Sequence, residues 1–164
     1  MNLKAILPVL LTMAPVATCH ALDPPAMQEG LWSVTATTIE NPGNKRAEHT
    51  TTVCRSHAYD AYALSVARRE PGCQPSIESF DDGQYKVEAH CVQGGTTIDS
   101  KATSTFQGVT QVHSVTVASY SPPLAGVAAV TMDTVQKFQG PCPSGMQPGD
   151  MTRADGSIRH LWKH

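Results

Sequence analysis

Aromatic and charged residues are scarce in this chain of 164 residues. Phe, Trp and Tyr make up 5 % of the sequence, and Asp, Glu, Lys and Arg make up 16 %. Twelve basic residues stand against fourteen acidic ones, so the formal net charge is −2 and there is no cationic surplus for binding nucleic acid. Because Gly and Pro are plentiful beside Ser and Thr, the composition favours one exported β-rich domain over a helical cytosolic enzyme.

Sequence signatures of catalysis are missing as well. The chain contains no G-x-S-x-G elbow, no H-E-x-x-H motif, no phosphate-binding loop and no dinucleotide fingerprint. A Ser–His–Asp triad could still assemble in space, because geometry rather than spacing defines it. The sequence therefore assigns no catalytic residue and no cofactor, and it favours a non-catalytic protein.

The first 21 residues have the pattern of a removable export signal. Lys4 precedes an apolar run over residues 5–17, which is shorter than the about 20 apolar residues of a membrane-spanning helix. Small residues then stand before a cleavage site after Ala21. The alternative is a lipoprotein acylated at Cys19. Both routes predict a domain outside the cytoplasm, in a Gram-negative periplasm, with no transmembrane segment in the mature chain.

Cleavage after Ala21 leaves four of the five cysteines, and an even number in an oxidising compartment predicts two disulfides. Three pairings are possible among Cys54, Cys73, Cys91 and Cys142. Close CxxC pairs are absent, which argues against a zinc site.

A predicted hairpin selects one of these pairings. Residues 80–84 (FDDGQ) suit a three-residue loop with Gly83 in a left-handed bulge. In that register the facing pairs are Ser79 with Tyr85, Ile77 with Val87, and Cys73 with Cys91. We therefore predict the disulfide Cys73–Cys91, which leaves Cys54–Cys142 as the second.

Seven segments have the alternation or the β-branched content of strands. They are residues 30–40, 47–54, the two halves of the hairpin between Cys73 and Cys91, and residues 96–106, 109–120 and 127–138. One helix is expected over residues 56–67, with Ser56 as its N-cap and with Arg68 and Arg69 at the negative end of its dipole.

Short turns between consecutive strands indicate an antiparallel meander, and about seven such strands must curl. We predict a mainly β domain over residues 22–142, curled into a barrel or half-barrel, with the helix between strands two and three covering one opening. A two-layer sandwich is the alternative. Residues 22–29 are expected to form a mobile lead-in, and residues 143–164 an irregular C-terminal tail.

A curled sheet presents a concave face that could hold a ligand. The candidate lining residues are Trp32, Val34, Val115, Val117, Val130 and Met132. On the helix, Tyr59, Tyr62 and Val66 form an apolar stripe that either packs on the sheet or closes a ligand cavity.

Histidine spacing offers one candidate metal site. His160 and His164 are four residues apart, which would place both imidazoles on one face of a helix. No carboxylate or cysteine motif flanks them, so we interpret the pair as part of an exposed tail and assign no metal ligand.

Five stretches, in order, resemble a known family. They are residues 28–35 (QEGLWSVT), residues 52–54 (TVC), the pairs Gly72–Cys73 and His90–Cys91, and residues 140–150 (GPCPSGMQPGD). Over residues 27–151 this order resembles the uncharacterised bacterial exported family known as domain of unknown function 3617. The resemblance implies export and a β-rich disulfide fold, and it transfers no functional residue to this chain.

Together these observations predict a non-catalytic binding or accessory module for a small hydrophobic ligand or an envelope partner. Two alternatives stay open. One is an envelope hydrolase whose site assembles in space. The other is a structural envelope protein whose sheet edge pairs with another chain.

Overall fold

The computed structural model describes residues 23–153 and 155–162. The predicted export signal, including Cys19 and the cleavage site after Ala21, lies outside the described residues, as does His164. Within the described ranges no helix is long and apolar enough to cross a membrane.

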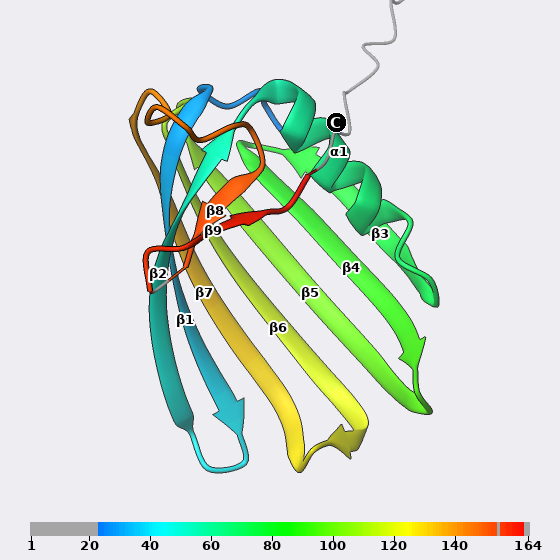
Figure 1. Ribbon diagram of the computed structural model, residues 1–164. Coiled ribbons are helices and arrows are strands. Elements are labelled where there is room, and N and C mark those ends of the chain that lie inside the picture. The colour runs from blue at the N-terminus through cyan, green and yellow to red at the C-terminus, as the bar shows by residue number, and fades with distance from the viewer. Residues whose placement is uncertain (1–22, 154, 163–164) are drawn as a thin grey trace, which may run out of the picture.

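Nine strands and one helix make up the described chain (Figure 1). In chain order they are β1 (Gly30–Asn41), β2 (Lys45–Arg55), α1 (His57–Arg68), β3 (Cys73–Asp81), β4 (Gln84–Gln93), β5 (Thr96–Gln107), β6 (Gln111–Leu124), β7 (Val127–Gly140), β8 (Asp150–Thr152) and β9 (Ile158–His160). They form one sheet in the order β3-β4-β5-β6-β7-β1-β2-β8-β9, and its neighbours pair antiparallel.

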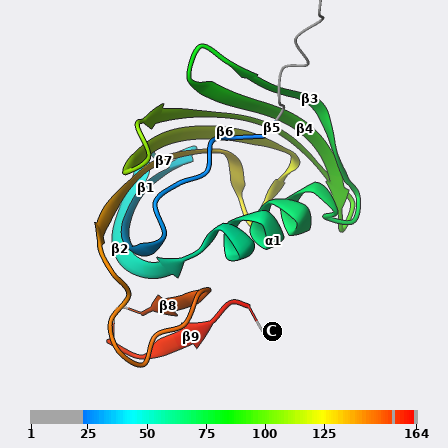
Figure 2. The same ribbon diagram turned by 90° about the horizontal axis from the view of Figure 1, so that it is seen from above.

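The chain builds this sheet in two parts joined by the helix. It begins with the β1–β2 hairpin, crosses through α1 to the far edge, and then meanders from β3 to β7 until β7 pairs with β1. The sheet curls into an open half-barrel, and α1 lies across the mouth of the curl (Figure 2). The predicted mainly β antiparallel fold is therefore confirmed in its half-barrel form, with the helix between strands two and three.

Cross-strand partners share a face, so the register identifies the concave side. Trp32 pairs with Val53 on β2 and with Phe138 on β7, and all three face the inside of the curl. Met27, Trp32, Val53 and Val112 form the buried cluster, with Phe106 packed against it.

Two of the predicted concave residues are on the other face. Met132 and Val130 do lie on the concave face, where they pair with Thr116 and Ala118 of β6. Because side chains alternate between the faces along a strand, Val115 and Val117 point to the convex side. The prediction that these two valines line the interior was wrong, because strands with β-branched residues on both faces do not reveal which face is inside.

The first residue of β1 must be glycine. Gly30 has φ +137°, and a Cβ atom there would meet the carbonyl oxygen of Gly140 and lie 2.8 Å from the ring of Phe138. The glycine before Trp32 thus lets β1 approach the end of β7, where the register between the two strands shifts.

The β3–β4 hairpin has a tighter loop than predicted. Asp82 and Gly83 form a two-residue connection and both have positive φ, so Phe80 rather than Ser79 faces Tyr85. An irregularity between Pro75 and Ile77 then adds one residue to β3. These two departures cancel, and Cys73 still lies opposite Cys91.

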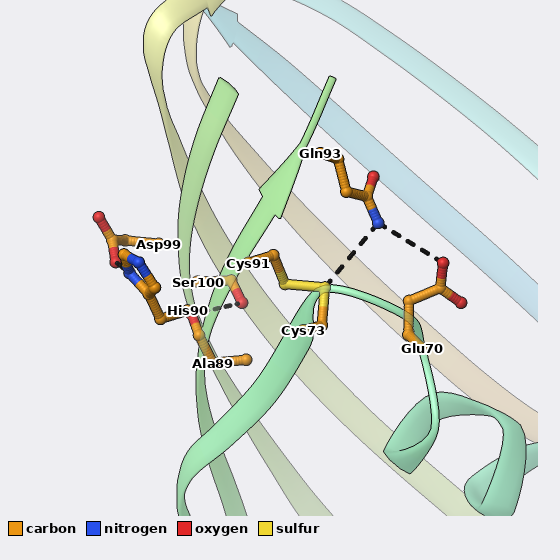
Figure 3. The surroundings of a disulfide bond; sticks show 8 residues. All are labelled: Glu70, Cys73, Ala89, His90, Cys91, Gln93, Asp99 and Ser100. Atoms are coloured by element: carbon orange, nitrogen blue, oxygen red, sulfur yellow. Dashed lines mark hydrogen bonds and ion pairs between the residues drawn. A yellow bond between two sulfur atoms is a disulfide. The ribbon is translucent and has the colours of Figure 1, made fainter. Parts of the chain in front are cut away.

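Both predicted disulfides are present. Cys73–Cys91 joins β3 to β4 beside the loop that follows α1, where the amide of Gln93 contacts both Cys73 Sγ and Glu70 (Figure 3). Cys54–Cys142 joins β2, just before α1, to the segment after β7. The two disulfides therefore flank α1 at both ends.

The C-terminal segment contains two short strands where an irregular tail was expected. β8 extends the sheet beyond β2, with the hydroxyls of Thr152 and Thr52 2.8 Å apart. The carboxylate of Asp150, which is 2 % exposed, accepts hydrogen bonds from the Gln147 backbone (2.9 Å) and from His160 Nδ1 (2.5 Å). The backbone hydrogen bond, with His160 as a second contribution, holds the pKa of Asp150 below its ordinary value.

Candidate functional site

A cavity with a volume of about 640 Å³ lies between α1 and the concave face of the sheet. Its apolar lining includes Met27, Val53, Leu64, Phe106 and Val112, and its polar lining includes Arg55, Asp60, Tyr85, Ser104, Ser114 and Gln136. The lead-in contributes Asp23 to Met27, so this segment forms part of the wall.

Small side chains on α1 leave this space open. Ser56 caps the helix as predicted, accepting a hydrogen bond from the Tyr59 backbone at 3.2 Å. Ala61, Leu64 and Ala67 face the cavity at helical spacings of three, and no residue of α1 is fully buried. The helix therefore bridges the half-barrel instead of packing tightly onto it.

The apolar stripe predicted on α1 lies largely to one side of the cavity. Tyr59 packs against the core cluster, whereas Tyr62 and Val66 are 41 % and 45 % exposed. Tyr62 stacks on Trp162 with ring centroids 5.8 Å apart, and Tyr59 contacts the same indole. This aromatic group fastens the helix to the C-terminal segment.

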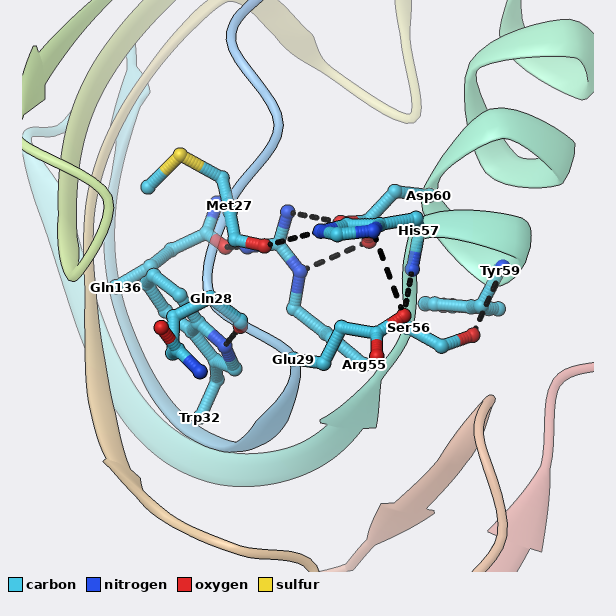
Figure 4. Close-up of polar contacts among 10 residues, drawn as sticks. All are labelled: Met27, Gln28, Glu29, Trp32, Arg55, Ser56, His57, Tyr59, Asp60 and Gln136. Atoms are coloured by element: carbon cyan, nitrogen blue, oxygen red, sulfur yellow. Dashed lines mark hydrogen bonds and ion pairs between the residues drawn. The ribbon is translucent and has the colours of Figure 1, made fainter.

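Arg55 lies at the end of the cavity where α1 begins, and it contacts several elements there (Figure 4). Its guanidinium donates to both carboxylate oxygens of Asp60 at 2.9 and 3.0 Å and to Gln136 Oε1 at 3.0 Å. The same group lies 4.7 Å from the ring centroid of Trp32. Through these contacts Arg55, on β2, connects α1, β7 and β1. Its side chain is only 15 % exposed, so the contacts are poorly hydrated.

Residues 27–29 of the lead-in, which were expected to be mobile, hydrogen-bond to the start of the helix and to β1. His57 Nε2 donates to the carbonyl oxygen of Met27 at 2.9 Å, and the His57 backbone amide donates to Glu29 Oε1 at 2.9 Å (Figure 4). Trp32 Nε1 donates to the carbonyl oxygen of Gln28 at 2.8 Å. Met27, 4 % exposed, is thereby held inside the half-barrel.

Arg68 organises the opposite end of the cavity. Its guanidinium hydrogen-bonds Glu78 on β3 and contacts Asp23 Oδ1 at 2.8 Å, and the Tyr85 hydroxyl donates to the same Glu78 carboxylate. The hydrogen bond from Arg68 holds the pKa of Glu78 below its ordinary value. Burial, aided by the bond to Glu78, raises the pKa of Tyr85 to about 12. At neutral pH the carboxyl is ionised and the phenol is neutral.

Neutral polar groups occupy the sheet between these two ends. Ser104 on β5 and Ser114 on β6 face each other with their hydroxyl oxygens 2.8 Å apart. Gln136 on β7 lies on the same face of the sheet, because it pairs with Val112, two residues from Ser114. Its side-chain oxygen accepts a hydrogen bond from Arg55. The cavity thus combines apolar walls with a hydrogen-bonding strip on its floor.

The family model for a protein of unknown function, DUF3617, matches residues 27–142. The chain belongs to the DUF3617 family. A search of curated proteins finds no match. The matched range begins at Met27 inside the cavity and ends at Cys142, so in this DUF3617 member it includes strands β1 to β7, α1 and both disulfides, whereas β8 and β9 follow it.

The residues named from the sequence as a concave lining do not form the wall of this DUF3617 cavity. Trp32 lies beneath it, covered by Arg55, and Val130 and Met132 are on the concave face nearer the start of β7 than Gln136. Sequence reasoning missed Arg55, Ser104, Ser114 and Gln136. The spacing of Ser104 and Phe106 on β5 was the one available signal. Residues two apart share a face of a strand, so this spacing places a polar side chain on the same face as a core aromatic ring.

Two histidines, His90 and His113, pair with carboxylates away from the cavity. His90 contacts Asp99 at 2.7 Å and His113 contacts Asp133 at 3.0 Å, both on the convex face. In the described ranges neither imidazole is hydrogen-bonded to a serine hydroxyl, and no three His, Cys, Asp or Glu side chains gather as metal ligands. These pairs orient imidazoles on the exposed convex surface of the sheet.

Proposed function

We propose that this protein is a non-catalytic binding module that holds a small hydrophobic ligand between α1 and the half-barrel. The observation that carries the proposal is the cavity of about 640 Å³. This volume lies within the range of small-molecule pockets, and such sites usually combine apolar walls with polar groups that fix the orientation of the ligand.

The packing of α1 supports the same proposal. A helix that served only to cover the core would bury its apolar side chains in the sheet, but this helix turns small residues toward open space. Its position is fixed instead at its ends, by the Arg55–Asp60 and Arg68–Glu78 contacts and by the two flanking disulfides. Such an arrangement keeps a cavity open that hydrophobic collapse would otherwise close.

Binding of the fluorescent probe N-phenylnaphthylamine to the purified, disulfide-bonded protein tests this function. The probe is apolar and uncharged and should bind the wild-type chain with increased fluorescence. Ala61→Phe places a ring in the cavity and should weaken binding by about tenfold or more, as overpacking penalties of 1–3 kcal/mol imply.

Ala58→Phe is the matched control, because Ala58 is an exposed residue of the same helix that does not line the cavity. It should retain wild-type affinity. Equal losses in the two variants, or no probe binding by the wild-type chain, would contradict a binding function for the cavity.

We further propose that the protein is exported to the periplasm. The apolar first segment and the two disulfides support this compartment, since disulfides persist where thiols are oxidised. The intact mass of the chain recovered after expression with its own leader should match a start at Leu22, lowered by the four hydrogens of two disulfides. A chain retaining Met1 would argue against export, and a diacylated chain starting at Cys19 would indicate a lipoprotein.

A further inference from the structure

The charged side chains around the cavity reveal which ligands it can accept. Within residues 23–153 and 155–162, the lining residues able to carry positive charge are Arg55, His57 and Arg68. A pocket for a fatty acid or another organic anion would leave at least one such group available to the ligand. Each of the three is instead engaged by a carboxylate of this chain.

Arg55 is neutralised by the most complete of these contacts. Asp60 accepts two hydrogen bonds from its guanidinium, Gln136 accepts a third, and the indole of Trp32 covers one face. A ligand carboxylate at this end would have to displace Asp60 from a bidentate pair whose partners are 15 % and 26 % exposed. The displaced Asp60 would then lie beside the ligand as a like charge.

The opposite end carries an excess of negative charge. Arg68 contacts both Asp23 and Glu78, so one cation is shared by two carboxylates. The Tyr85 hydroxyl is already committed to Glu78. At the rim, His57 Nδ1 lies 3.6 Å from Glu29 Oε1. Among the described residues, neither end of the cavity therefore offers an unpaired cation, and one end repels anions.

The polar groups still able to bind a ligand are uncharged. A hydrogen bond between Ser104 and Ser114 uses one hydroxyl proton, so the pair retains one donor and several lone pairs. The amide nitrogen of Gln136 makes no hydrogen bond within the described part of the chain, while its oxygen is held by Arg55. These donors and acceptors match an alcohol, ketone, ester or amide.

We propose that the cavity selects an uncharged apolar ligand that carries a hydroxyl or carbonyl group, and that it excludes carboxylates and sulfonates of the same size. The inference rests on the proposed binding function and specifies its ligand class. Ser104, Ser114 and Gln136 hydrogen-bond the ligand, whereas Glu78, Asp23 and Asp60 enforce the exclusion of anions.

Displacement of N-phenylnaphthylamine by decanol and by decanoate at neutral pH tests the selectivity. The two competitors share an alkyl chain and differ in charge, because carboxylic acids ionise well below pH 7. Decanol should displace the probe at a concentration about tenfold or more below that of decanoate. Glu78→Gln should reduce the ratio of the displacing concentration of decanoate to that of decanol. Glu88→Gln makes the same change on the convex face of the neighbouring strand β4 and should leave this ratio unchanged.

The hydroxyl pair has its own variant. Replacing Ser104 and Ser114 together with alanine should weaken displacement by decanol about two- to tenfold, as loss of one or two neutral hydrogen bonds implies, and should leave decanoate unaffected. If the probe binds but decanoate displaces it as well as decanol does, the inference fails while the binding function stands. If the probe does not bind the wild-type chain, both are overturned.

Discussion

Replacing Cys54 and Cys142 together with alanine is expected to lower the free energy of unfolding by about 4 to 5 kcal/mol. The disulfide closes a loop with a sequence separation of 88, whereas Cys73–Cys91 closes one of 18. Because the entropy that a crosslink removes from the unfolded chain grows with loop length, the corresponding value for the Cys73–Cys91 pair is about 3 kcal/mol. Urea unfolding followed by circular dichroism measures both.

The local structure around Cys54 adds to this expectation. Cys54 is 1 % exposed, and its carbonyl oxygen accepts a hydrogen bond from the Gly149 backbone at 2.8 Å. Arg55 and the helix cap Ser56 follow directly, so loss of the disulfide also frees the start of α1. We therefore expect the double variant to bind N-phenylnaphthylamine more weakly than the wild-type chain. A larger loss of stability from the Cys73 and Cys91 pair would contradict the loop-length argument.

The cysteine pairing was predictable although the hairpin register was not. A three-residue loop and a regular β3 put Cys73 opposite Cys91, and so do a two-residue loop and one extra residue near Pro75. Pro lacks the N–H group that a regular ladder needs, so Pro75 was the signal for the irregularity. The face of each side chain in between depends on the loop, which is why Phe80 rather than Ser79 faces Tyr85.

The cavity depends on contacts that sequence periodicity does not contain. Alternation identified most of the strands, and the cap residue Ser56 identified the start of α1. The position of α1 over the sheet, however, is determined by Arg55 and Arg68, whose partners are 81 residues away for Gln136, 10 for Glu78 and 45 for Asp23. These partners come together because the chain crosses from β2 to β3 at the far edge of the sheet. The contacts of Arg55 and Arg68 can therefore be predicted only when the sheet order is known.

Trp32→Ala is expected to lower the free energy of unfolding by about 3 to 5 kcal/mol, the range for truncating a fully buried large aromatic side chain. Trp32 is 0 % exposed and contacts Phe138 edge-on at 6.0 Å between ring centroids. It also supports the guanidinium of Arg55 and donates to the carbonyl oxygen of Gln28. Chemical unfolding followed by circular dichroism measures the change without relying on tryptophan fluorescence.

Trp162→Ala is the matched control, because the same side chain is removed from a half-buried position against Tyr59 and Tyr62. It should cost clearly less than Trp32→Ala, and an equal cost would contradict the assignment of Trp32 to the centre of the core. Trp32→Phe separates packing from hydrogen bonding. It keeps an aromatic ring beneath Arg55 but leaves the Gln28 carbonyl without its indole donor, at a cost of about 1 to 2 kcal/mol. Because that bond holds the lead-in that carries Met27 into the cavity, Trp32→Phe should also change probe affinity while the sheet stays folded.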